Sequence, residues 1–257
     1  MAETFASLQI MKRQSGFIKR LGKAVLGITG LRLLDWVEVF YLPEDEIFVP
    51  IISKSGCSTI KEALIRKFNP SFESTFPEIH QIDPERETNG KVLRLKFYQY
   101  SKYTKFSRGK EMHLVLRDPA NRFISCYKDI VSGKNIMYEH PSELYIWLPF
   151  ATDMSFSTFS KRVYNTPDYL SDRHFRSQSY YLNGRVKENL ADLKIYKLSD
   201  FMKSSDLIPR DYKETKRKLN QSKANQAIHP DSEKLRSDRN FRKRYARDLY
   251  LFEQTLK

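Results

Sequence analysis

The strongest constraint on the fold is a strand, a small-residue loop and a helix that follow one another without a gap. Residues 46–53 (EIFVPIIS) form a short β-branched run, which predicts a strand. The loop KSGCST comes next, and IKEALIRKF then has the apolar spacing of a helix. Its predicted apolar face carries Ile60, Leu64 and Phe68, and its predicted polar side carries Lys61, Glu62 and Arg66.

A second junction of the same kind lies further along the chain. Residues 112–116 (MHLVL) are a compact apolar run, which Arg117 ends. Asp118 followed by Pro119 is typical of the start of a helix, because aspartate caps the first turn and proline fits its first position. We therefore expect two strands of one sheet, each ending at a loop that leads into a helix.

Further elements are predicted between and after these junctions. Alternation of period two predicts a half-buried strand over residues 91–98, and ADLKIYKLS at 191–199 predicts another. The segments 155–164 and 168–182 have mainly helical patterns. We find no internal repeat or linker, so the sequence favours a single α/β domain.

The end of the chain concentrates its positive charge. The 257 residues include 45 Lys and Arg against 31 Asp and Glu, a formal net charge of +14, and segment 210–247 carries a large share of the excess. Residues 231–256 predict a helix with one apolar face, whereas the preceding LNQSKANQAIHP has loop composition. So large a charge favours an anionic partner such as a nucleotide, a nucleic acid, an acidic glycan or a membrane surface.

Cysteine content and hydropathy exclude several protein classes. Only Cys57 and Cys126 are present, which excludes a disulfide-dense scaffold and a zinc ribbon, and no residues have the spacing of metal ligands. The most apolar N-terminal stretch, 24–41, is interrupted by charges and falls short of the ~20 apolar residues of a membrane span. Segment 17–34 suits a helix packed on the domain better than peripheral contact with a membrane, which stays the alternative.

Both junctions place a cation beside the amide groups that begin a helix. The unpaired N–H groups of a helix N-terminus attract anions, and small residues let an anion approach the backbone. Lys54 adds a full charge to the first loop, and Ser58 and Thr59 add hydroxyl groups. Arg117 offers a fork of donors at the second junction, where Ser125 adds a hydroxyl. The first loop lacks the GxxxxGK[ST] sequence of Walker-type triphosphatases, so such an enzyme is not indicated. The two junctions together suggest two sites for phosphate-like groups.

In order and spacing, several segments resemble those of the carbohydrate sulfotransferases. VPIISKSGCSTIKEAL is similar to the loop that binds the 5′-phosphosulfate in this family, and LVLRDPANRFISCYKD is similar to its 3′-phosphate motif. FSTFSKRVY, DRHFRSQSYYL and RYARDLYLFEQ continue the resemblance over residues 46–254. The branch most resembled includes the Golgi chondroitin and dermatan 4-O-sulfotransferases.

The resemblance implies a P-loop-like, three-layer α/β fold with a central, mainly parallel sheet flanked by helices. Residues 46–257 would form the sulfotransferase domain, and residues 1–45 an N-terminal helical extension. The implied donor is 3′-phosphoadenosine 5′-phosphosulfate (PAPS), whose sulfuryl group moves in line to a carbohydrate hydroxyl without a metal. An acidic glycan or a glycolipid would suit the charge as acceptor. Because a Golgi-type anchor is not evident in the sequence, we expect a cytoplasmic location.

The resemblance also implies roles for individual residues. Lys54 would stabilise the charge that accumulates on the leaving phosphate, and Arg117 and Ser125 would hold the 3′-phosphate. Lys223 lies in a loop expected to cover the nucleotide. The residues expected to hold the 5′ side are Lys54, Ser55, Gly56, Cys57, Ser58 and Thr59.

The acceptor hydroxyl must lose a proton as it attacks, and a histidine suits this task near neutral pH. His174, in the segment DRHF, matches the Asp-x-His-aromatic motif of the family and is the predicted base, with Glu62 as a second candidate. A nucleophilic role for Cys57 or Cys126 is less favoured, because in-line transfer needs no covalent enzyme intermediate.

Two other functions are consistent with the charge. Segment 210–247 could be the phosphate footprint of a nucleic-acid-binding protein, with Phe241 and Tyr245 as contacts, but these aromatics fall on the stripe predicted to be buried. A kinase-like phosphotransferase would suit the two anion sites, but the sequence has no acidic metal-holding motif. Sulfuryl transfer is the favoured function, and nucleic acid is not expected as a partner.

Overall fold

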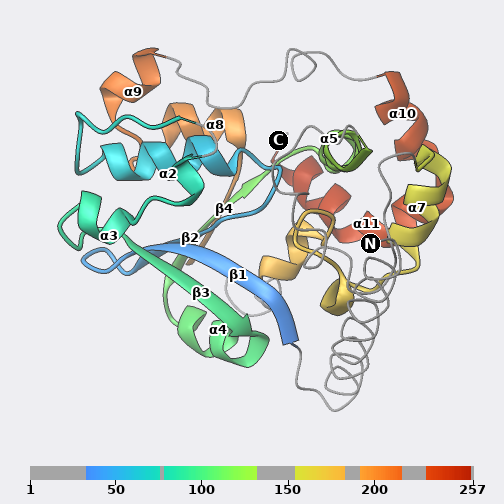
Figure 1. The fold of residues 1–257 in the computed structure, drawn as a ribbon, viewed down its shortest axis with the longest axis horizontal. Coiled ribbons are helices and arrows are strands. Elements are labelled where there is room, and N and C mark those ends of the chain that lie inside the picture. Colours follow the sequence, from blue (N-terminus) through green and yellow to red (C-terminus); the bar gives the residue numbers. More distant parts are fainter. Residues whose placement is uncertain (1–32, 76–77, 132–153, 183–191, 216–229, 256–257) are drawn as a thin grey trace, which may run out of the picture.

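The computed structural model describes residues 33–75, 78–131, 154–182, 192–215 and 230–255 (Figure 1). In this part of the chain five strands form one sheet in the order β3-β1-β2-β4-β5. The strands are β1 (Leu33–Leu42), β2 (Ile47–Pro50), β3 (Leu93–Gln99), β4 (Glu111–Leu116) and β5 (Leu193–Lys197). β2, β4 and β5 are parallel neighbours, whereas β1 runs antiparallel to both β2 and β3.

Helices cover both faces of the sheet. They are α2 (Cys57–Arg66), α3 (Pro84–Glu87), α4 (Tyr100–Ser107), α5 (Pro119–Val131), α7 (Phe156–Tyr164), α8 (Leu198–Ser204), α9 (Arg210–Thr215), α10 (Pro230–Ser237) and α11 (Arg239–Gln254), with short 3-10 turns η1 (Glu78–His80), η3 (Asp168–Leu170) and η4 (Gln178–Leu182). In Figure 1, α2, α8 and α9 lie on one side of the sheet and α4 lies on the other, while α5, α7, α10 and α11 gather beside it. This arrangement confirms the α/β class and the P-loop-like fold expected from the sequence.

Strand β1 corrects the expectation that residues 1–45 form a helical extension. Residues 33–42 are a strand inside the sheet, paired with β2 on one side and with β3 on the other. Period-two alternation explains this, since Phe40 and Leu42 pack on the face covered by α2, and Val37 and Val39 on the opposite face. Residues 1–32 lie outside the described part of the chain, so the packing predicted for segment 17–34, and its alternative of contact with a membrane, stay predictions.

The core has one layer on each face of the sheet and a third cluster among the helices. The residues that α2, α8 and α9 bury against the sheet include Ile60, Leu64, Phe201 and Tyr212. On the opposite face, Tyr103 of α4 packs against Phe48 of β2 with the ring centroids 6.4 Å apart. The third cluster joins α5, α7 and α11 and contains Phe123, Phe159, Phe241 and Tyr245.

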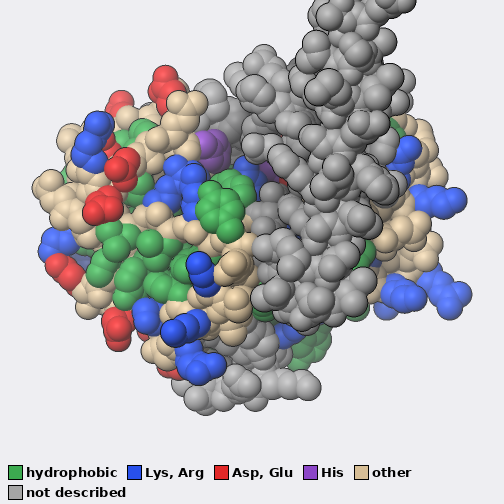
Figure 2. Space-filling view, turned by 60° about the horizontal axis from the view of Figure 1, so that its bottom comes forward, with side chains coloured by type: hydrophobic (Ala, Val, Ile, Leu, Met, Phe, Trp, Pro, Cys, Tyr) green, Lys and Arg blue, Asp and Glu red, His purple; other side chains and the backbone are tan. Residues whose placement is uncertain are grey.

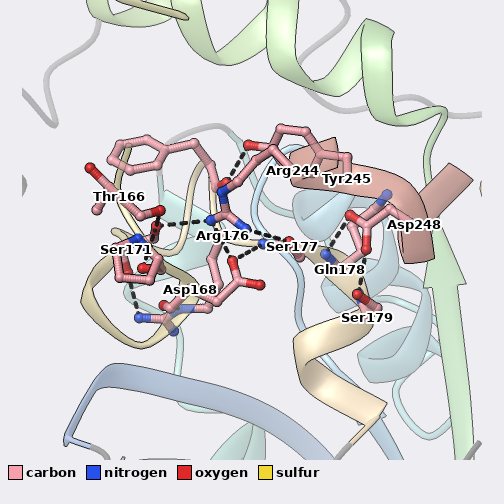
Figure 3. A network of polar contacts seen from close by, with 12 residues as sticks. Thr166, Asp168, Ser171, Arg176, Ser177, Gln178, Ser179, Arg244, Tyr245 and Asp248 are labelled. Carbon is pink, nitrogen blue, oxygen red and sulfur yellow. Dashed lines mark hydrogen bonds and ion pairs between the residues drawn. The ribbon is translucent and has the colours of Figure 1, made fainter. Parts of the chain in front are cut away.

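The segment 168–182 does not form the mainly helical structure expected for it. It contains only the two 3-10 turns η3 and η4, because side chains take up its backbone groups (Figure 3). Asp168 accepts from the N–H of Ser177 at 2.8 Å, and the Arg176 guanidinium donates to the carbonyls of Asp168 and Ser171 at 3.2 and 2.7 Å. Arg244 of α11 donates to Asp168 at 2.5 Å, which ties the segment to the last helix.

The predicted C-terminal helix is divided in two. Asp238 separates α10 from α11, and its carboxylate accepts the N–H of Phe241 at 2.7 Å, which caps the second helix. No helix in the described ranges is both long and apolar enough to cross a membrane. On the face that Figure 2 shows, Lys and Arg side chains gather beside hydrophobic ones, whereas Asp and Glu lie mainly toward its left edge.

Candidate functional site

The two predicted anion loops meet at one edge of the sheet. The loop 53–56 follows β2, and Arg117 follows β4, which is the parallel neighbour of β2. The Arg117 guanidinium Nη1 donates to the carbonyl oxygen of Lys54 at 3.1 Å. Ligands of open α/β sheets bind at the carboxyl ends of parallel strands, which is where these loops lie.

The first loop has a backbone that favours glycine at Gly56. Lys54 and Gly56 both have positive φ, at 66° and 83°. A Cβ atom at Gly56 would lie 2.4 Å from Cδ2 of Leu198, so a larger residue would also collide with α8. Gly56 is the N-cap residue of α2 and has no side chain with which to cap the helix, and no other cap comes from the described part of the chain. The first N–H groups of α2 therefore remain available for an anion.

Three cations converge beside this helix start. Lys54 forms an ion pair with Asp129 of α5, and burial lowers the pKa of Lys54 below its ordinary value, with nearby Arg117 and Arg122 acting in the same direction. Burial likewise lowers the pKa of Arg117, and Arg122 adds to the shift. Cations whose charged forms are disfavoured by burial and by one another gain stability when an anion binds between them.

Arg122 is a site residue that the prediction missed. Its Nε donates to the carbonyl of Ser53 at 2.9 Å, and its Nη1 and Nη2 donate to the carbonyls of Arg176 and Arg173 at 2.8 and 3.1 Å. One buried guanidinium thus joins the first loop to the backbone on both sides of His174. The arginine pattern of the second motif was the signal that could have identified it.

His174 lies between Arg173 and Arg176, whose carbonyls Arg122 holds, and a carboxylate orients its ring. Its Nδ1 is 2.6 Å from Oδ1 of Asp172, which also accepts the N–H of His174 at 2.8 Å. Both side chains are buried. An imidazole held in this way by a carboxylate carries its proton on Nδ1 and presents Nε2 as an acceptor.

Gln178, which the prediction also missed, bonds to both loops. Its Oε1 accepts from Ser55 Oγ at 2.8 Å and from the N–H of Arg117 at 3.0 Å, and its Nε2 donates to the carbonyl of Arg117 at 2.8 Å. The backbone N–H groups of Gln178 and Ser179 donate to the carboxylate of Asp248 in α11 at 2.7 and 2.8 Å (Figure 3). Burial raises the pKa of Asp248, whereas these two N–H groups, the Ser179 side chain and the charge of Arg122 act in the opposite direction.

The polar side predicted for α2 is wrong at two of its three residues. Lys61 is buried and pairs with Glu38 at 2.7 Å, because Glu38 lies on the same face of β1 as Phe40, the face that α2 covers. Glu62 is buried against α9, where it accepts from the hydroxyl of Tyr212 at 3.0 Å. The structure therefore places Glu62, the second candidate base, in the core packing of α2 and α9.

The structure places all but one of the remaining predicted site residues near the start of α2 or on α5. Ser58 and Thr59 lie buried in the first turn of α2, and Cys57 lies half-buried beside them. Ser125 is half-buried on α5, one turn before Asp129, so it shares the helix face that meets Lys54. Lys223 lies outside the described residues.

The structure gives no support to a nucleophilic Cys126. Burial raises the pKa of its thiol to about 12, so the unreactive protonated form prevails at neutral pH. No group of three or more His, Cys, Asp or Glu in the described segments could hold a metal ion. Phe241 and Tyr245, the contact residues of the nucleic-acid alternative, are buried among the helices.

Comparison with known proteins places the chain in a family. Neither the curated proteins nor the solved structures include a match. The sequence model described as the sulfotransferase family matches residues 37–256, which include both loops and extend from β1 to the end of α11. The chain therefore belongs to the sulfotransferase family.

Proposed function

We propose that the protein transfers the sulfuryl group of PAPS to a hydroxyl group of a carbohydrate, as in the chondroitin and dermatan 4-O-sulfotransferase branch that the sequence resembles. Membership of the family makes the chain a sulfuryl transferase, and the donor and the acceptor are the proposed part. The observation that carries the proposal is the contact between Arg117 and the carbonyl of Lys54, because it joins two anion sites at neighbouring strand ends. PAPS has anionic groups at its 3′ and 5′ positions, which suits a pair of adjoining sites.

In this mechanism the first loop holds the 5′ end of the donor. The amides from Gly56 to Thr59 and the hydroxyls of Ser58 and Thr59 would contact the phosphosulfate. Lys54 would exchange its ion pair with Asp129 for a contact with the bridging oxygen, where charge accumulates as the S–O bond breaks. Preorganised donors of this kind lower the barrier without rearranging during the reaction.

The second loop would hold the 3′-phosphate. Arg117 supplies two parallel N–H groups, and Ser125 a hydroxyl, from the strand end and from α5. Arg117 already bonds the carbonyl of Lys54, so binding at the 3′ end fixes the position of the first loop.

His174 is the proposed base. The acceptor oxygen attacks sulfur, the bond from sulfur to the phosphate oxygen breaks, and the hydroxyl proton passes to Nε2 of His174. Asp172, 2.6 Å from Nδ1, holds the ring and stabilises the imidazolium that forms. Adenosine 3′,5′-bisphosphate and the sulfated acceptor are the products, so atoms and charge balance without another reactant.

Binding of the nucleotide product tests the donor assignment. Adenosine 3′,5′-bisphosphate should raise the melting temperature far more than adenosine 5′-monophosphate, because only the former fills both loops. Arg117→Ala should remove most of this difference, whereas Lys102→Ala, an exposed residue of α4, should leave it unchanged. Equal shifts with the two nucleotides would refute a 3′-phosphate site.

A transfer assay tests the acceptor. The donor labelled in its sulfuryl group is offered with a panel of acidic glycans, neutral glycans and lipid-linked sugars, and the labelled product is identified. Lys54→Ala and His174→Ala should each abolish most of the turnover while the folded state remains. Strongly salt-dependent binding to RNA or DNA without any response to the bisphosphate would favour the nucleic-acid alternative instead.

A further inference from the structure

A cluster of buried and half-buried polar side chains lies at the start of α2, beside the first loop. Lys61 Nζ is 2.7 Å from Oε1 of Glu38 and 3.3 Å from Nδ1 of His80. The other ring nitrogen of His80, Nε2, is 3.1 Å from Oγ of Ser58. Arg94 of β3 pairs with Glu38 at 2.5 Å and donates to the carbonyl of His80 at 2.8 Å. The mechanism proposed above uses only Ser58 of these residues.

The contacts of Lys61 decide which nitrogen of His80 carries the proton. Burial by itself would raise the pKa of Glu38, but Lys61 and Arg94 hold it below the ordinary value, so Glu38 is ionised. Burial lowers the pKa of Lys61, but the charge of Glu38 and the hydrogen bond to it, 2.7 Å away, act in the opposite direction and favour the ammonium form. An ammonium group donates and cannot accept. Nδ1 of His80 must therefore be the acceptor, because a proton there would face the ammonium at 3.3 Å.

The proton of His80 consequently lies on Nε2 and faces Ser58. The ring stays neutral, because burial, and then the charge of Lys61, lowers its pKa to about 3. Nε2–H donates to Ser58 Oγ at 3.1 Å, so Ser58 is the acceptor in this bond. A hydroxyl that accepts from one side has its own proton to donate elsewhere. Ser58 is the second residue of α2, beside the uncapped N–H groups of the first turn.

We propose that His80 is a positioning residue, which fixes the Ser58 hydroxyl as a hydrogen-bond donor to the 5′-phosphate group of the nucleotide. The inference rests on the proposed function, since that function supplies the phosphate. The chain Glu38, Lys61, His80 and Ser58 extends from the sheet to the loop through the contacts given above. Without His80, Ser58 would be free to turn its proton toward another acceptor, and one donor to the phosphate would be lost.

Two substitutions of His80 separate this role from a general structural one. The amide nitrogen of His80→Gln can take the place of Nε2 and still donate to Ser58. The amide oxygen of His80→Asn can take the place of Nδ1 and still accept from Lys61, but nothing then donates to Ser58. By titration calorimetry with adenosine 3′,5′-bisphosphate, we expect the Gln variant to bind within about twofold of the wild type and the Asn variant about tenfold more weakly.

The same substitutions in a Ser58→Ala background complete the test. In that background His80→Asn should not lower the affinity for the bisphosphate further, because the hydroxyl that His80 positions is gone. The proposal would be overturned if His80→Gln and His80→Asn lowered the affinity equally. It would also be overturned if His80→Asn still lowered the affinity in the Ser58→Ala background. If the wild type binds the bisphosphate and the Asn variant binds it equally well, only this inference fails. If the wild type does not bind it, the proposed function fails as well.

A spectroscopic measurement on the unmodified protein keeps the proposal testable if a variant does not fold. Long-range nitrogen–proton NMR spectra distinguish the two neutral forms of a histidine ring. We expect His80 to carry its proton on Nε2 at pH 7 without nucleotide. A proton on Nδ1, or a doubly protonated ring, would refute the proposal.

Discussion

Replacing Gln178 by methionine should uncouple the two loops while keeping the volume of the side chain. The substitution removes three hydrogen bonds, which join Gln178 to Ser55 Oγ and to the N–H and carbonyl of Arg117. Ser55 and Gln178 are fully buried, so water cannot replace these partners. At about 0.5–1.5 kcal/mol for each bond, the free energy of unfolding should fall by about 1.5–4.5 kcal/mol. A typical domain survives such a loss, so the variant should still fold.

Urea unfolding measures this loss, with Gln81→Met at an exposed position as the matched control. The Gln178→Met variant should unfold at lower urea with an unchanged slope, and its affinity for adenosine 3′,5′-bisphosphate should also fall, because Ser55 and Arg117 no longer share a partner. A stability within about 0.5 kcal/mol of the control would refute the reasoning, since buried groups without partners cannot cost so little. Reduced stability with unchanged affinity would show that Gln178 supports the fold alone.

Three further predictions follow from single residues. Burial by itself would raise the pKa of Asp168, but Arg244 and Ser177 hold it below the ordinary value. The contribution of Asp168 to the free energy of unfolding is therefore present above about pH 4, and it is lost as the pH falls through the pKa of the folded state. The stability difference between wild type and Asp168→Asn should therefore shrink from pH 7 to about pH 3 in urea titrations, and an unchanged difference would contradict the assignment. Gly56→Ala should destabilise the protein more than Gly109→Ala in the same titrations, because both have positive φ but only Gly56 has a neighbour that an added Cβ would meet; equal losses would refute the steric argument. The thiol of Cys126, with its pKa raised to about 12, should resist iodoacetamide until urea unfolds the chain, and mass spectrometry of the alkylated peptides would reveal labelling of the native state if this is wrong.

The two strand, loop and helix junctions could be predicted because their signals are local. The apolar run of β4, the capping residue Asp118 and the small residues before α2 each act on their own stretch of chain. That the two loops meet then follows from parallel strand pairing, which the α/β pattern implies. The contact between Lys54 and Arg117 is the outcome of these local preferences.

The features that the prediction missed depend on partners far away in the sequence. Lys61 has the position of a solvated residue on α2, and only the pairing of β1 with β2 brings Glu38 to it. Segment 168–182 has helical periodicity, but Asp168 and Arg244, which bond across 76 residues, hold it in another form. Hydrogen bonds and ion pairs between distant elements cannot be predicted from the periodicity of the sequence.

The carboxylate of Asp248 has a consequence for the order in which the protein can mature during synthesis. It lies 70 residues beyond Gln178, whose backbone it holds, and still further beyond the loop that Gln178 bonds. The ribosome synthesises that loop early, yet Asp248 cannot hold the backbone of Gln178 until α11 has left the exit tunnel. Newly made chains should thus acquire nucleotide affinity only after α11 has emerged from the ribosome, and a chain stopped before residue 248 should lack it.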